Sequence, residues 1–446
     1  MDMKIPQRPP SEKNLLGGLK PERWFQIFQL IKEHVFDARY FHWDELRFRK
    51  PPQGLTHEEW WMVLKMRRRA GYRDISLKDK SGQPFHFCVP DLVTDLLHQI
   101  DRGGGTFVQI PEQITNADQR DRYVIRSLME EAITSSQLEG AATTREVAKK
   151  MLAEGRKPRN HSERMIANNY ATMQRILELR ENSLTPEMVF QIHTAVSQNA
   201  LDIADGAGRF RRPDEAVDVS DHEGNVFHVP PPAEELPARL QAMCDFANAK
   251  TSEFFVHPVI RGIILHFWLA YDHPFVDGNG RTARALFYWQ MLHSGYWMFE
   301  FISISHFLRK APVQYGMAFL YAETDENDLT YFIIHQAEII RRALKELHDY
   351  VARKSSETRS CLDALQKYPE LNHRQQALIS HAVRHPGFVY NIAGHKTRQG
   401  ITYATARSDL LRLVQSGLFK QRKVGKAFVF VAPIDLESRL TLKFAR

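Results

Sequence analysis

The chain has 446 residues, of which 43% are hydrophobic, a length that predicts two or three domains and a composition too apolar for a disordered protein. No apolar run is long enough to span a bilayer, and the amino-terminal residues lack the apolar core of a secretory signal peptide. The formal net charge of +7 is concentrated in residues 371–446, which carry +10, so the remaining residues do not have the charge of a nucleic-acid binder.

Residues 1–105 predict a mostly helical amino-terminal region. Helices are expected at residues 21–34 and 58–69, with a short hairpin around Ser81-Gly82. Trp60-Trp61 and the basic residues that follow allow an aromatic-basic patch for nucleic acid, but one face packed inward and the other solvated is the favoured interpretation. The glycines at 103–105 predict a hinge rather than a phosphate loop, because no strand or helix signal frames them.

The next predicted element is a helix over residues 122–138. Its apolar positions recur on one side, at Ile125, Leu128, Met129, Ala132 and Ile133. Gly140 then follows, and glycine commonly stands just beyond the end of a helix.

A small hairpin is expected between Gly208 and Pro232. Two short alternating runs, Val217–Val219 and Val226–Val229, flank the turn residues His222–Asn225, and the prolines at 230–232 stop further strand pairing. The strand pattern alone does not distinguish a functional hairpin from an unrelated surface feature.

The most informative stretch is His273–Arg284, which follows a strongly apolar helix predicted to carry Val259 to Tyr271. His266 on that helix is interpreted as a hydrogen-bonded core histidine rather than a ligand. Glycines let the backbone approach an anion, and a helix beginning after the turn would offer free N–H groups to phosphate. A lone carboxylate suits Mg²⁺ shared with substrate phosphates, and a histidine can accept a proton near neutral pH. The groups concerned are His273, Asp277, Gly278, Asn279, Gly280, Arg281 and Arg284.

This stretch closely resembles the signature of Fic-domain proteins, His-Pro-Phe-x-Asp/Glu-Gly-Asn-Gly-Arg-x-x-Arg, with every fixed position filled. Most such proteins transfer AMP from ATP to a hydroxyl side chain of a target protein. They hold that target by main-chain bonds to a hairpin, so the resemblance implies that the hairpin between Gly208 and Pro232 is a docking flap. The resemblance implies that His273 is the base that deprotonates the hydroxyl and that Asp277 holds Mg²⁺ against the α- and β-phosphates. It also implies that Asn279 and the amides of Gly278 and Gly280 cradle the phosphates.

The two arginines receive further roles from the resemblance. Arg281 would engage the β-phosphate and Arg284 the γ-phosphate. Gly280 bears on the choice of reaction, because relatives that phosphorylate tend to carry Lys there. Many relatives place paired tyrosines near the adenine, whereas this chain has Tyr315-Gly316, so Tyr315 is only a tentative adenine contact.

Residues Ser135–Gly140 match the inhibitory pattern of the same family, Ser/Thr-x-x-x-Glu-Gly/Asn. In relatives with this motif the glutamate forms a salt bridge with the second arginine, so Glu139 would pair with Arg284. A guanidinium cannot bind a carboxylate and a phosphate bidentately at once, so Glu139 would leave ATP in an unproductive pose. In some relatives the same glutamate positions a water that removes AMP, and the sequence leaves this alternative open.

Residues 371–446 predict a separate carboxy-terminal module. Amphipathic helices are expected at 373–384 and 402–415, followed by strands at 418–423 and 427–431 around a Val424-Gly425-Lys426 turn. This order resembles a winged helix-turn-helix, with residues 402–412 as its recognition helix. DNA binding through the basic hairpin and a protein-interaction or dimerisation role both remain open.

We therefore expect a mainly α protein with three parts: a helical region at 1–105, a Fic-type core with a hairpin flap at 106–354, and a winged helix-turn-helix at 371–446. The expected function is adenylyl transfer from ATP, with Mg²⁺, to a Ser, Thr or Tyr hydroxyl of a target protein or of the chain itself. The alternatives are AMP removal through Glu139 and a DNA-binding regulator with a nucleotide-sensing core. Three scattered cysteines without metal-ligand spacing favour a cytoplasmic protein. A homodimer would fit the resemblance but no segment establishes it.

Overall fold

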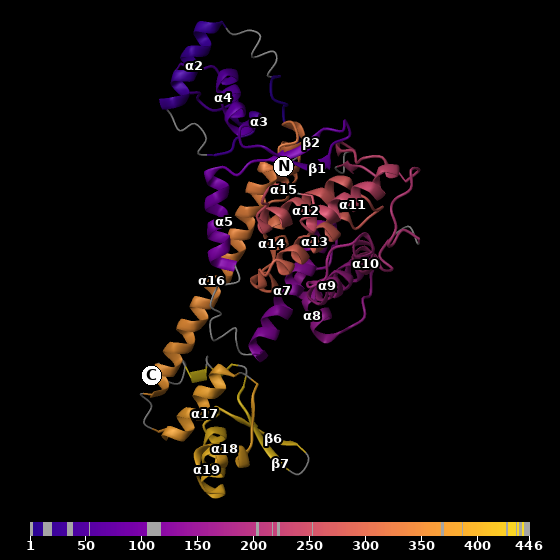
Figure 1. Ribbon diagram of the computed structural model, residues 1–446. Helices are drawn as coiled ribbons and strands as arrows, with labels where there is room; N and C mark the ends of the chain where they lie inside the picture. The colour runs from indigo at the N-terminus through magenta and orange to yellow at the C-terminus, as the bar shows by residue number, and fades with distance from the viewer. Residues whose placement is uncertain are drawn as a thin grey trace. The chain divides into compact units, whose positions relative to one another are not determined.

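The computed structural model describes residues 3–11, 20–33, 39–52, 54–104, 117–201, 205–215, 217–220, 224–251, 253–366, 370–385, 387–424, 427–433, 435–436 and 439–440. The chain divides into two compact units, one made of residues 1–108 and 127–344 and the other of residues 109–126 and 345–446. Most of the described secondary structure is helical, as the fold class predicted (Figure 1).

The first unit begins with helices and a hairpin, and continues as a helical body. Its elements are α2 (Pro21–Glu33), α3 (Trp43–Leu46), α4 (His57–Arg69), β1 (Arg73–Lys78), β2 (Pro84–Phe87), α5 (Asp91–Gly104), α7 (Ala117–Leu138), α8 (Arg145–Glu154), α9 (His161–Leu179), α10 (Pro186–Ser197), β3 (Val219–Ser220), β4 (Val226–His228), η1 (Ala233–Glu235), α11 (Leu236–Ala247), α12 (Pro258–Asp272), α13 (Asn279–His293), η2 (Trp297–Phe301), α14 (Ile304–Lys310), α15 (Pro312–Thr324) and α16 (Thr330–Gln366). Two boundaries between the units fall within α7 and α16, and the third, between residues 108 and 109, lies outside the described residues.

Helices α12 and α13 form the centre of this unit. Nearly every residue of both is buried, including Trp268, Leu286 and Trp289, so both are covered around their whole circumference. α11 packs against α12, while α9 and α10 pack against α13 (Figure 1). The loop at residues 273–278 therefore connects two helices whose positions are fixed by packing on several sides.

The predicted inward packing of the first tryptophan pair is confirmed. Trp60 and Trp61 are buried in a cluster with α2 and α3, and Thr56 caps α4 through a capping box with Glu59. Lys65 is 1% exposed and lies 2.9 Å from Asp325 Oδ1, while Arg68 donates to Tyr331 Oη at 2.9 Å. Lys65 and Arg68 therefore make their contacts inside the protein and do not form a surface for nucleic acid.

Two local predictions differ from the structure. Gly103 and Gly104 lie inside α5 rather than in a hinge, and an added Cβ on Gly104 would lie 3.2 Å from Leu344 Cδ1, so this glycine allows close packing; Gly105 lies outside the described residues. α7 begins five residues before the predicted helix, and Ile125 is 40% exposed although the apolar stripe placed it inward. A periodic pattern cannot show where along a helix the neighbouring elements stop covering it.

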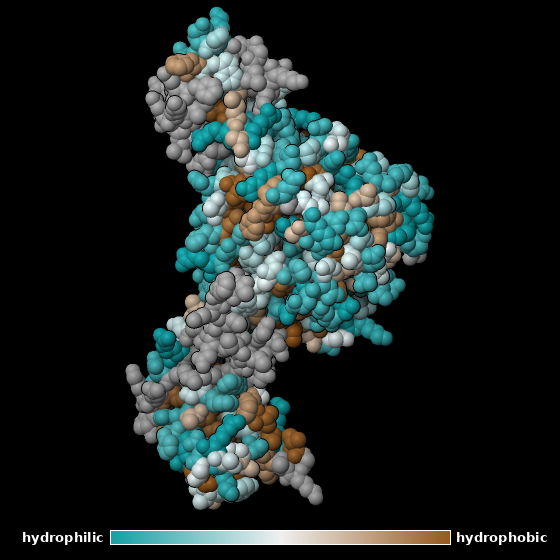
Figure 2. Space-filling view, in the orientation of Figure 1, coloured by the Kyte–Doolittle hydropathy of each residue, from teal (hydrophilic) through white to brown (hydrophobic). Residues whose placement is uncertain are grey.

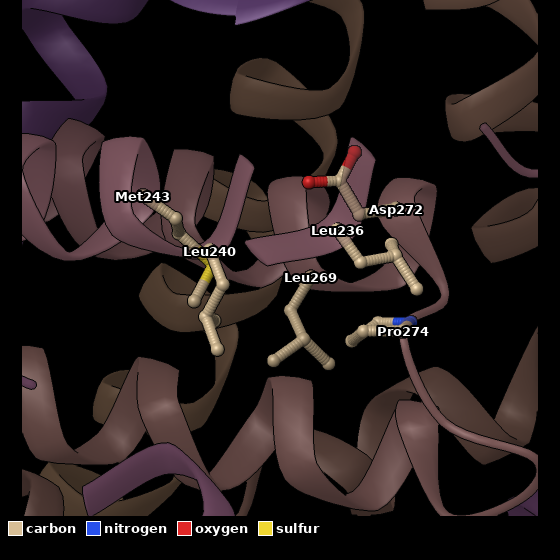
Figure 3. Close-up of a pocket in the computed structure, with 6 residues that line it drawn as sticks. All are labelled: Leu236, Leu240, Met243, Leu269, Asp272 and Pro274. Carbon is tan, nitrogen blue, oxygen red and sulfur yellow. The ribbon is translucent and has the colours of Figure 1, made fainter. Parts of the chain in front are cut away.

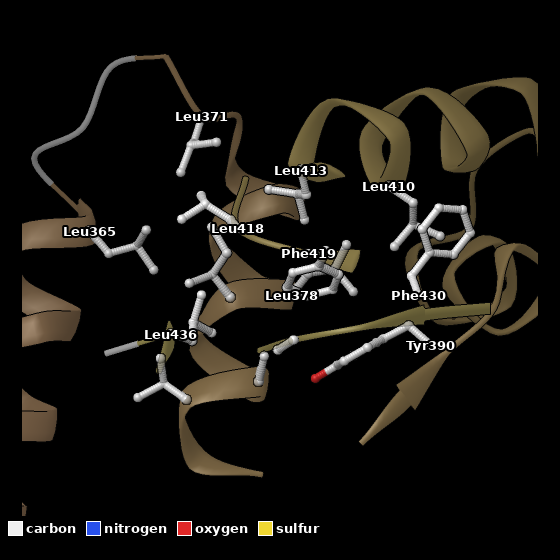
Figure 4. Close-up of a cluster of buried hydrophobic side chains, with 14 of the residues drawn as sticks. Leu365, Leu371, Leu378, Tyr390, Leu410, Leu413, Leu418, Phe419, Phe430 and Leu436 are labelled. Carbon is white, nitrogen blue, oxygen red and sulfur yellow. The ribbon is translucent and has the colours of Figure 1, made fainter. Parts of the chain in front are cut away.

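The second unit has its own hydrophobic core. Its described elements beyond α16 are α17 (His373–Arg384), β5 (Val389–Tyr390), α18 (Ile392–Gln399), α19 (Tyr403–Gln415), β6 (Lys420–Val424) and β7 (Ala427–Val431). The strands form an antiparallel sheet in the order β5-β7-β6, with Val389 opposite Val431 and Gln421 opposite Phe430. Leu378, Leu410, Leu413, Phe419 and Phe430 fill the space between the sheet and the helices (Figure 4).

This order of helix, strand, two helices and hairpin is consistent with the expected winged helix-turn-helix. α17 and α19 have the predicted extents, to within a residue, but α18 and β5 were not predicted. α18 is only eight residues long and β5 two, and such short elements carry too few periods to stand out in a sequence. Gly425 and Lys426 of the predicted turn lie outside the described residues.

The visible face of the molecule is largely hydrophilic (Figure 2). No helix in the described part of the chain combines the length and the apolarity that crossing a membrane would require.

Candidate active site

His273 terminates α12 in a left-handed backbone conformation. Its φ is 45° and its N–H bonds to Leu269 O at 3.0 Å. Few residues other than glycine adopt such a φ, so the imidazole is directed by a constrained backbone. The Nδ1 atom lies 3.3 Å from Ala270 O, which can only accept, so Nδ1 carries the hydrogen and Nε2 keeps a lone pair.

The surroundings keep this imidazole neutral. Burial first, and then the nearby His228, lower the pKa of His273 to about 4, although Glu139 works in the opposite direction. A neutral imidazole with Nδ1 protonated is ready to accept a proton at Nε2, which is the property that a general base requires.

The loop after His273 is closed by Asn279. The side-chain amide of Asn279 donates to Phe275 O at 2.7 Å, and its oxygen accepts from Phe275 N at 3.0 Å. The sequence resemblance assigned this amide to the phosphates, whereas here both of its polar atoms hold the loop. Any contribution of Asn279 to anion binding from this conformation would come through its backbone N–H.

Helix α13 begins at this loop, directly after Gly278, which has a φ of 81°. The first N–H groups of a helix have no intrahelical acceptor, and the helix dipole makes this end positive. The start of α13 therefore has the properties of an anion site, as the pattern of glycines predicts.

The chain's own Glu139 lies at this anion site. An added Cβ on Gly280 would lie 2.9 Å from Glu139 Cδ and closer still to its Oε1, so the carboxylate rests directly on the glycine. Glu139 stands just after α7, where Gly140 has a φ of 91° and Ala141 N bonds to Ser136 O at 3.0 Å. The helix cap thus fixes the backbone that presents this carboxylate.

Arg284 binds the same carboxylate. Its Nη2 donates to Glu139 Oε1 at 2.7 Å, and its Nε donates to Ser135 Oγ at 2.8 Å. Burial alone would raise the pKa of Glu139, but Arg284 and then Arg281 outweigh it, so the pKa lies below its ordinary value. Glu139 is therefore ionised and held by a guanidinium whose side chain is only 2% exposed.

Arg281 and Asp277 form a second ion pair in the loop. Arg281 Nη2 lies 3.2 Å from Asp277 Oδ2, and Arg281 is fully buried while half of the Asp277 side chain is exposed. Among the described residues, the Nε of Arg281 is a buried donor without a hydrogen-bond partner. The pair leaves a buried cation next to an accessible carboxylate.

A metal at this place would have few protein ligands. No cluster of three or more His, Cys, Asp or Glu able to hold a metal occurs in the described part of the chain. The half-exposed carboxylate of Asp277 nevertheless fits Mg²⁺, which keeps several waters and is commonly held by one carboxylate plus substrate phosphates.

Two residues that the sequence analysis did not identify hold the loop in place. His193 on α10 donates from Nε2 to Asp277 O at 2.9 Å, accepts at Nδ1 from Gly208 N at 3.0 Å, and stacks on Phe275. Arg211 donates from Nε to His273 O at 2.9 Å, and its own N–H bonds to Pro274 O at 2.9 Å. Neither residue stands in a pattern that marks a site, so only the three-dimensional structure reveals them.

Tyr315 on α15 lies at the other side of Arg284. Its hydroxyl is 2.8 Å from His266 Nε2. Burial raises the pKa of Tyr315 to about 12; Arg284 acts in the opposite direction and Glu139 in the same direction. His266 is fully buried, as the interpretation of a core histidine predicted. Tyr315 is thus linked to Arg284 and His266, and its contact with the adenine stays a prediction.

The expected hairpin flap is present as β3 and β4. Val219 pairs with His228 and Ser220 with Val226, in antiparallel register. His222 and Glu223 of the predicted turn lie outside the described residues.

A shallow apolar pocket lies between α11 and α12 beneath Pro274. It is lined by Leu236, Leu240, Met243, Leu269, Asp272 and Pro274 (Figure 3). The Asp272 carboxylate is already bound by Arg239 Nε at 2.7 Å and Trp268 Nε1 at 3.0 Å, so it offers little to a polar ligand.

The site is a neutral imidazole, a helix N-terminus between two glycines, two buried arginines and an accessible carboxylate, all within residues 273–284. Residues 183–291 match the Fic/DOC family model. The matched residues include the loop 273–284 with His193 and the flap, and exclude α7 and the carboxy-terminal unit.

Two curated proteins with a similar sequence are named protein adenylyltransferases. The chain is 36% identical over 117 residues to a protein adenylyltransferase Fic from Nematostella vectensis, covering 26% of this chain and 25% of that protein. It is 31% identical over 159 residues to a protein adenylyltransferase Fic from Culex quinquefasciatus, covering 35% and 29%. The chain thus spans between a quarter and a third of the length of these relatives.

A solved structure shows the same fold over a longer stretch. A Fic family protein from Desulfovibrio desulfuricans G20 superposes with a TM-score of 0.52 at 18% identity, covering 77% of this chain and 96% of that protein. At this identity the likeness concerns the fold.

Proposed function

We propose that this chain is a protein adenylyltransferase whose activity is restrained by its own Glu139. The substrates would be ATP and a Ser, Thr or Tyr hydroxyl of a target protein or of the chain itself. The catalytic core would lie within residues 106–354, with α7 as its inhibitory helix. The carrying observation is that the Glu139 carboxylate rests on Gly280 at the start of α13 and pairs with Arg284 at 2.7 Å.

In this reaction the target hydroxyl oxygen would form a bond to the α-phosphorus of ATP, and the bond from that phosphorus to the bridging oxygen would break, releasing pyrophosphate. Nε2 of His273 would take the hydroxyl proton, since its Nδ1 is committed to Ala270 O. Arg281, Arg284 and the N–H groups at the start of α13 would bind the phosphates. Asp277 would hold Mg²⁺, which neutralises phosphate charge when bound.

The restraint would be a competition for one guanidinium. Arg284 presents a planar fork, and Glu139 occupies it together with the space above Gly280. A phosphate entering the anion site would meet a carboxylate of the same charge, so the triphosphate would be displaced from the position that attack requires. A displacement of about an ångström can lower a rate by about a hundredfold.

Incubation with ATP labelled at the α-phosphate tests this function. We expect the Glu139→Gly variant, given Mg²⁺ and a cell lysate, to transfer at least about a hundredfold more label than the wild type. Glu154→Gly is the matched control, because Glu154 also stands at a helix end but is exposed and remote from the loop. Adding His273→Ala to Glu139→Gly should lower transfer by about a hundredfold to ten-thousandfold.

The outcomes separate the alternatives. Absence of label on any protein with Glu139→Gly would refute the transferase, and undiminished label with His273→Ala would refute the assignment of the base. If the wild type removes label from a target modified by the variant, and Glu139→Gly does not, Glu139 serves AMP removal instead.

A second function, DNA binding by the carboxy-terminal unit, is favoured by where its charges lie. Asp409 is buried and bound by Arg374 and His395, at 2.7 Å and 3.2 Å. The exposed residues of α18, α19 and β6 include Lys396, Arg398, Arg407, Arg412, Lys420, Arg422 and Lys423. With the acid of α19 neutralised inside, the described surface of these elements presents cations, as a module that binds phosphates would.

A further inference from the structure

The last residue of β4, His228, fastens the flap to two helices of the core. Its Nδ1 lies 2.7 Å from Glu323 Oε2 on α15, and its Nε2 lies 2.7 Å from Tyr271 O on α12. The His228 side chain is 8% exposed and that of Glu323 is 20% exposed. Three segments distant in sequence therefore meet at one imidazole, two residues before Pro230.

Both partners of this imidazole can act only as acceptors when Glu323 is ionised. A backbone carbonyl never donates, and a carboxylate has no hydrogen to give. The two hydrogen bonds together therefore require one proton more than a neutral imidazole and a carboxylate contain. His228 carries it as an imidazolium, or Glu323 carries it and donates to Nδ1.

Removing that proton would set two electron pairs against each other. The lone pair of Nδ1 would face the Glu323 carboxylate at hydrogen-bond distance, and one of the two bonds that hold β4 would be replaced by repulsion. The other groups near His228 are Tyr271, whose ring packs against it, the Asp272 carboxylate and His273. Arg239 pairs with Asp272 at 2.7 Å, so Asp272 is already compensated.

The flap borders the catalytic loop at this point. Arg211 donates to both His273 O and Pro231 O, so the segment after β4 and the backbone of His273 share one guanidinium. A flap that docks a target by main-chain bonds fixes where the target hydroxyl lies. The contact of His228 with Glu323 and Tyr271, called the seat of the flap below, sets the distance between the flap and His273.

We infer that His228 and Glu323 are positioning residues that share a proton and thereby seat the flap beside His273. This inference rests on the proposed function for its consequence, which is placement of the target hydroxyl. The hydrogen bonds of His228 themselves do not depend on whether the chain transfers AMP. The seat is present while the pair holds its extra proton and is lost as pH rises and the proton leaves.

Two substitutions of Glu323 distinguish proton sharing from ordinary packing. In Glu323→Gln the amide N–H donates to the Nδ1 of a neutral His228, while Nε2–H still donates to Tyr271 O, so the seat no longer needs the extra proton. Glu323→Ala removes the bond at every pH. Glu338→Gln on α16 is the control, because Glu338 lies in a surface pair with Arg342.

Amide hydrogen exchange at residues 226–229 tests the seat without any substrate. Over the pH range in which the chain stays folded, we expect wild-type protection factors to fall with rising pH, by up to about tenfold per pH unit once the proton is lost. Glu323→Gln should keep its protection across this range, Glu323→Ala should be poorly protected throughout, and Glu338→Gln should follow the wild type. Equal protection in wild type and Glu323→Ala, or one pH course for wild type and Glu323→Gln, would overturn the inference.

A kinetic arm uses the Glu139→Gly background. Glu323→Ala should raise KM for the target about tenfold with little change in kcat, and Glu323→Gln should restore KM and remove its rise at high pH. If the background variant transfers no AMP, the proposed function fails while the exchange result still decides the seat. If transfer occurs and KM is unchanged by Glu323→Ala, the positioning role is refuted and the proposed function stands.

Discussion

At the scale of single residues, the site depends on protonation states set by neighbours. His273 is neutral because burial and His228 lower its pKa to about 4, and Glu139 is charged because Arg284 and Arg281 offset its burial. The base and the restraining anion that we propose are therefore both in the protonation states that their roles require near neutral pH. The identities of these residues are readable from the sequence, but their protonation states follow from burial.

The depressed pKa of His273 predicts an unusual pH profile. A base works in its neutral form, so kcat of Glu139→Gly should be level above about pH 5 and fall about tenfold per unit below about pH 4. Tryptophan fluorescence at each pH serves as the control for folding. A fall in rate that begins near pH 6.5 would instead contradict the lowered pKa of His273.

At the scale of elements, the amino-terminal helices are tied to the core by buried charges. Lys65 on α4 pairs with Asp325 between α15 and α16, and Tyr40 and Tyr72 donate to Asp328 Oδ2 at 2.6 Å and 2.8 Å. Glu326 and Asn327 in the same connection have positive φ values of 56° and 65°. These bonds hold a strained connection in place, directly after the helix that carries Tyr315 and Glu323.

Breaking this buried pair should destabilise the larger unit strongly. Lys65→Ala leaves Asp325 charged and unpaired in the interior, which costs about 3–5 kcal/mol, whereas Lys150→Ala on the exposed face of α8 should cost at most about 1 kcal/mol. Denaturant unfolding followed by tryptophan fluorescence measures both, because all seven tryptophans lie within residues 1–344. Similar losses for the two variants would show that the Lys65 pair contributes no more than a surface pair.

At the scale of the whole molecule, charge is divided between the parts of the chain. Residues 371–446 carry +10 while the rest of the chain is slightly acidic. β6 is exposed along its length, and three of its five residues are lysine or arginine. This distribution supports the proposals that the tail binds phosphates over an extended surface and that the core loop binds them at a single site.

Duplex DNA should therefore bind the full chain in a strongly salt-dependent manner. In gel shifts with random duplexes, raising salt from about 50 mM to about 200 mM should weaken binding by a hundredfold or more if four or five phosphates are contacted, with each contact adding about one to the logarithmic slope. Arg422→Ala with Lys423→Ala should lower that slope by about two, and Lys80→Ala, in the other unit, should not. Salt-independent binding, or an unchanged slope in the double variant, would refute DNA binding by this hairpin.

The sequence by itself determined the features that depend on local order. The apolar periods gave α12, α13, α17 and α19, and the turn residues gave the glycine-lined start of α13, because helix signals and turn chemistry act between near neighbours in the chain. The motif of residues 273–284 also predicts the chemistry of the loop, since its histidine, carboxylate, glycines and arginines lie within twelve consecutive positions.

Only the tertiary structure decided what depends on residues far apart in sequence. Glu139 meets Arg284 across 145 positions, His193 reaches Asp277 across 84, and His228 meets Glu323 across 95. The same holds for Asn279, whose amide is directed by the packing of the loop toward Phe275 rather than outward. Packing of α7, α10 and α15 around α12 and α13 brings these groups together, and no local pattern encodes which distant side chain will fill a given hydrogen bond.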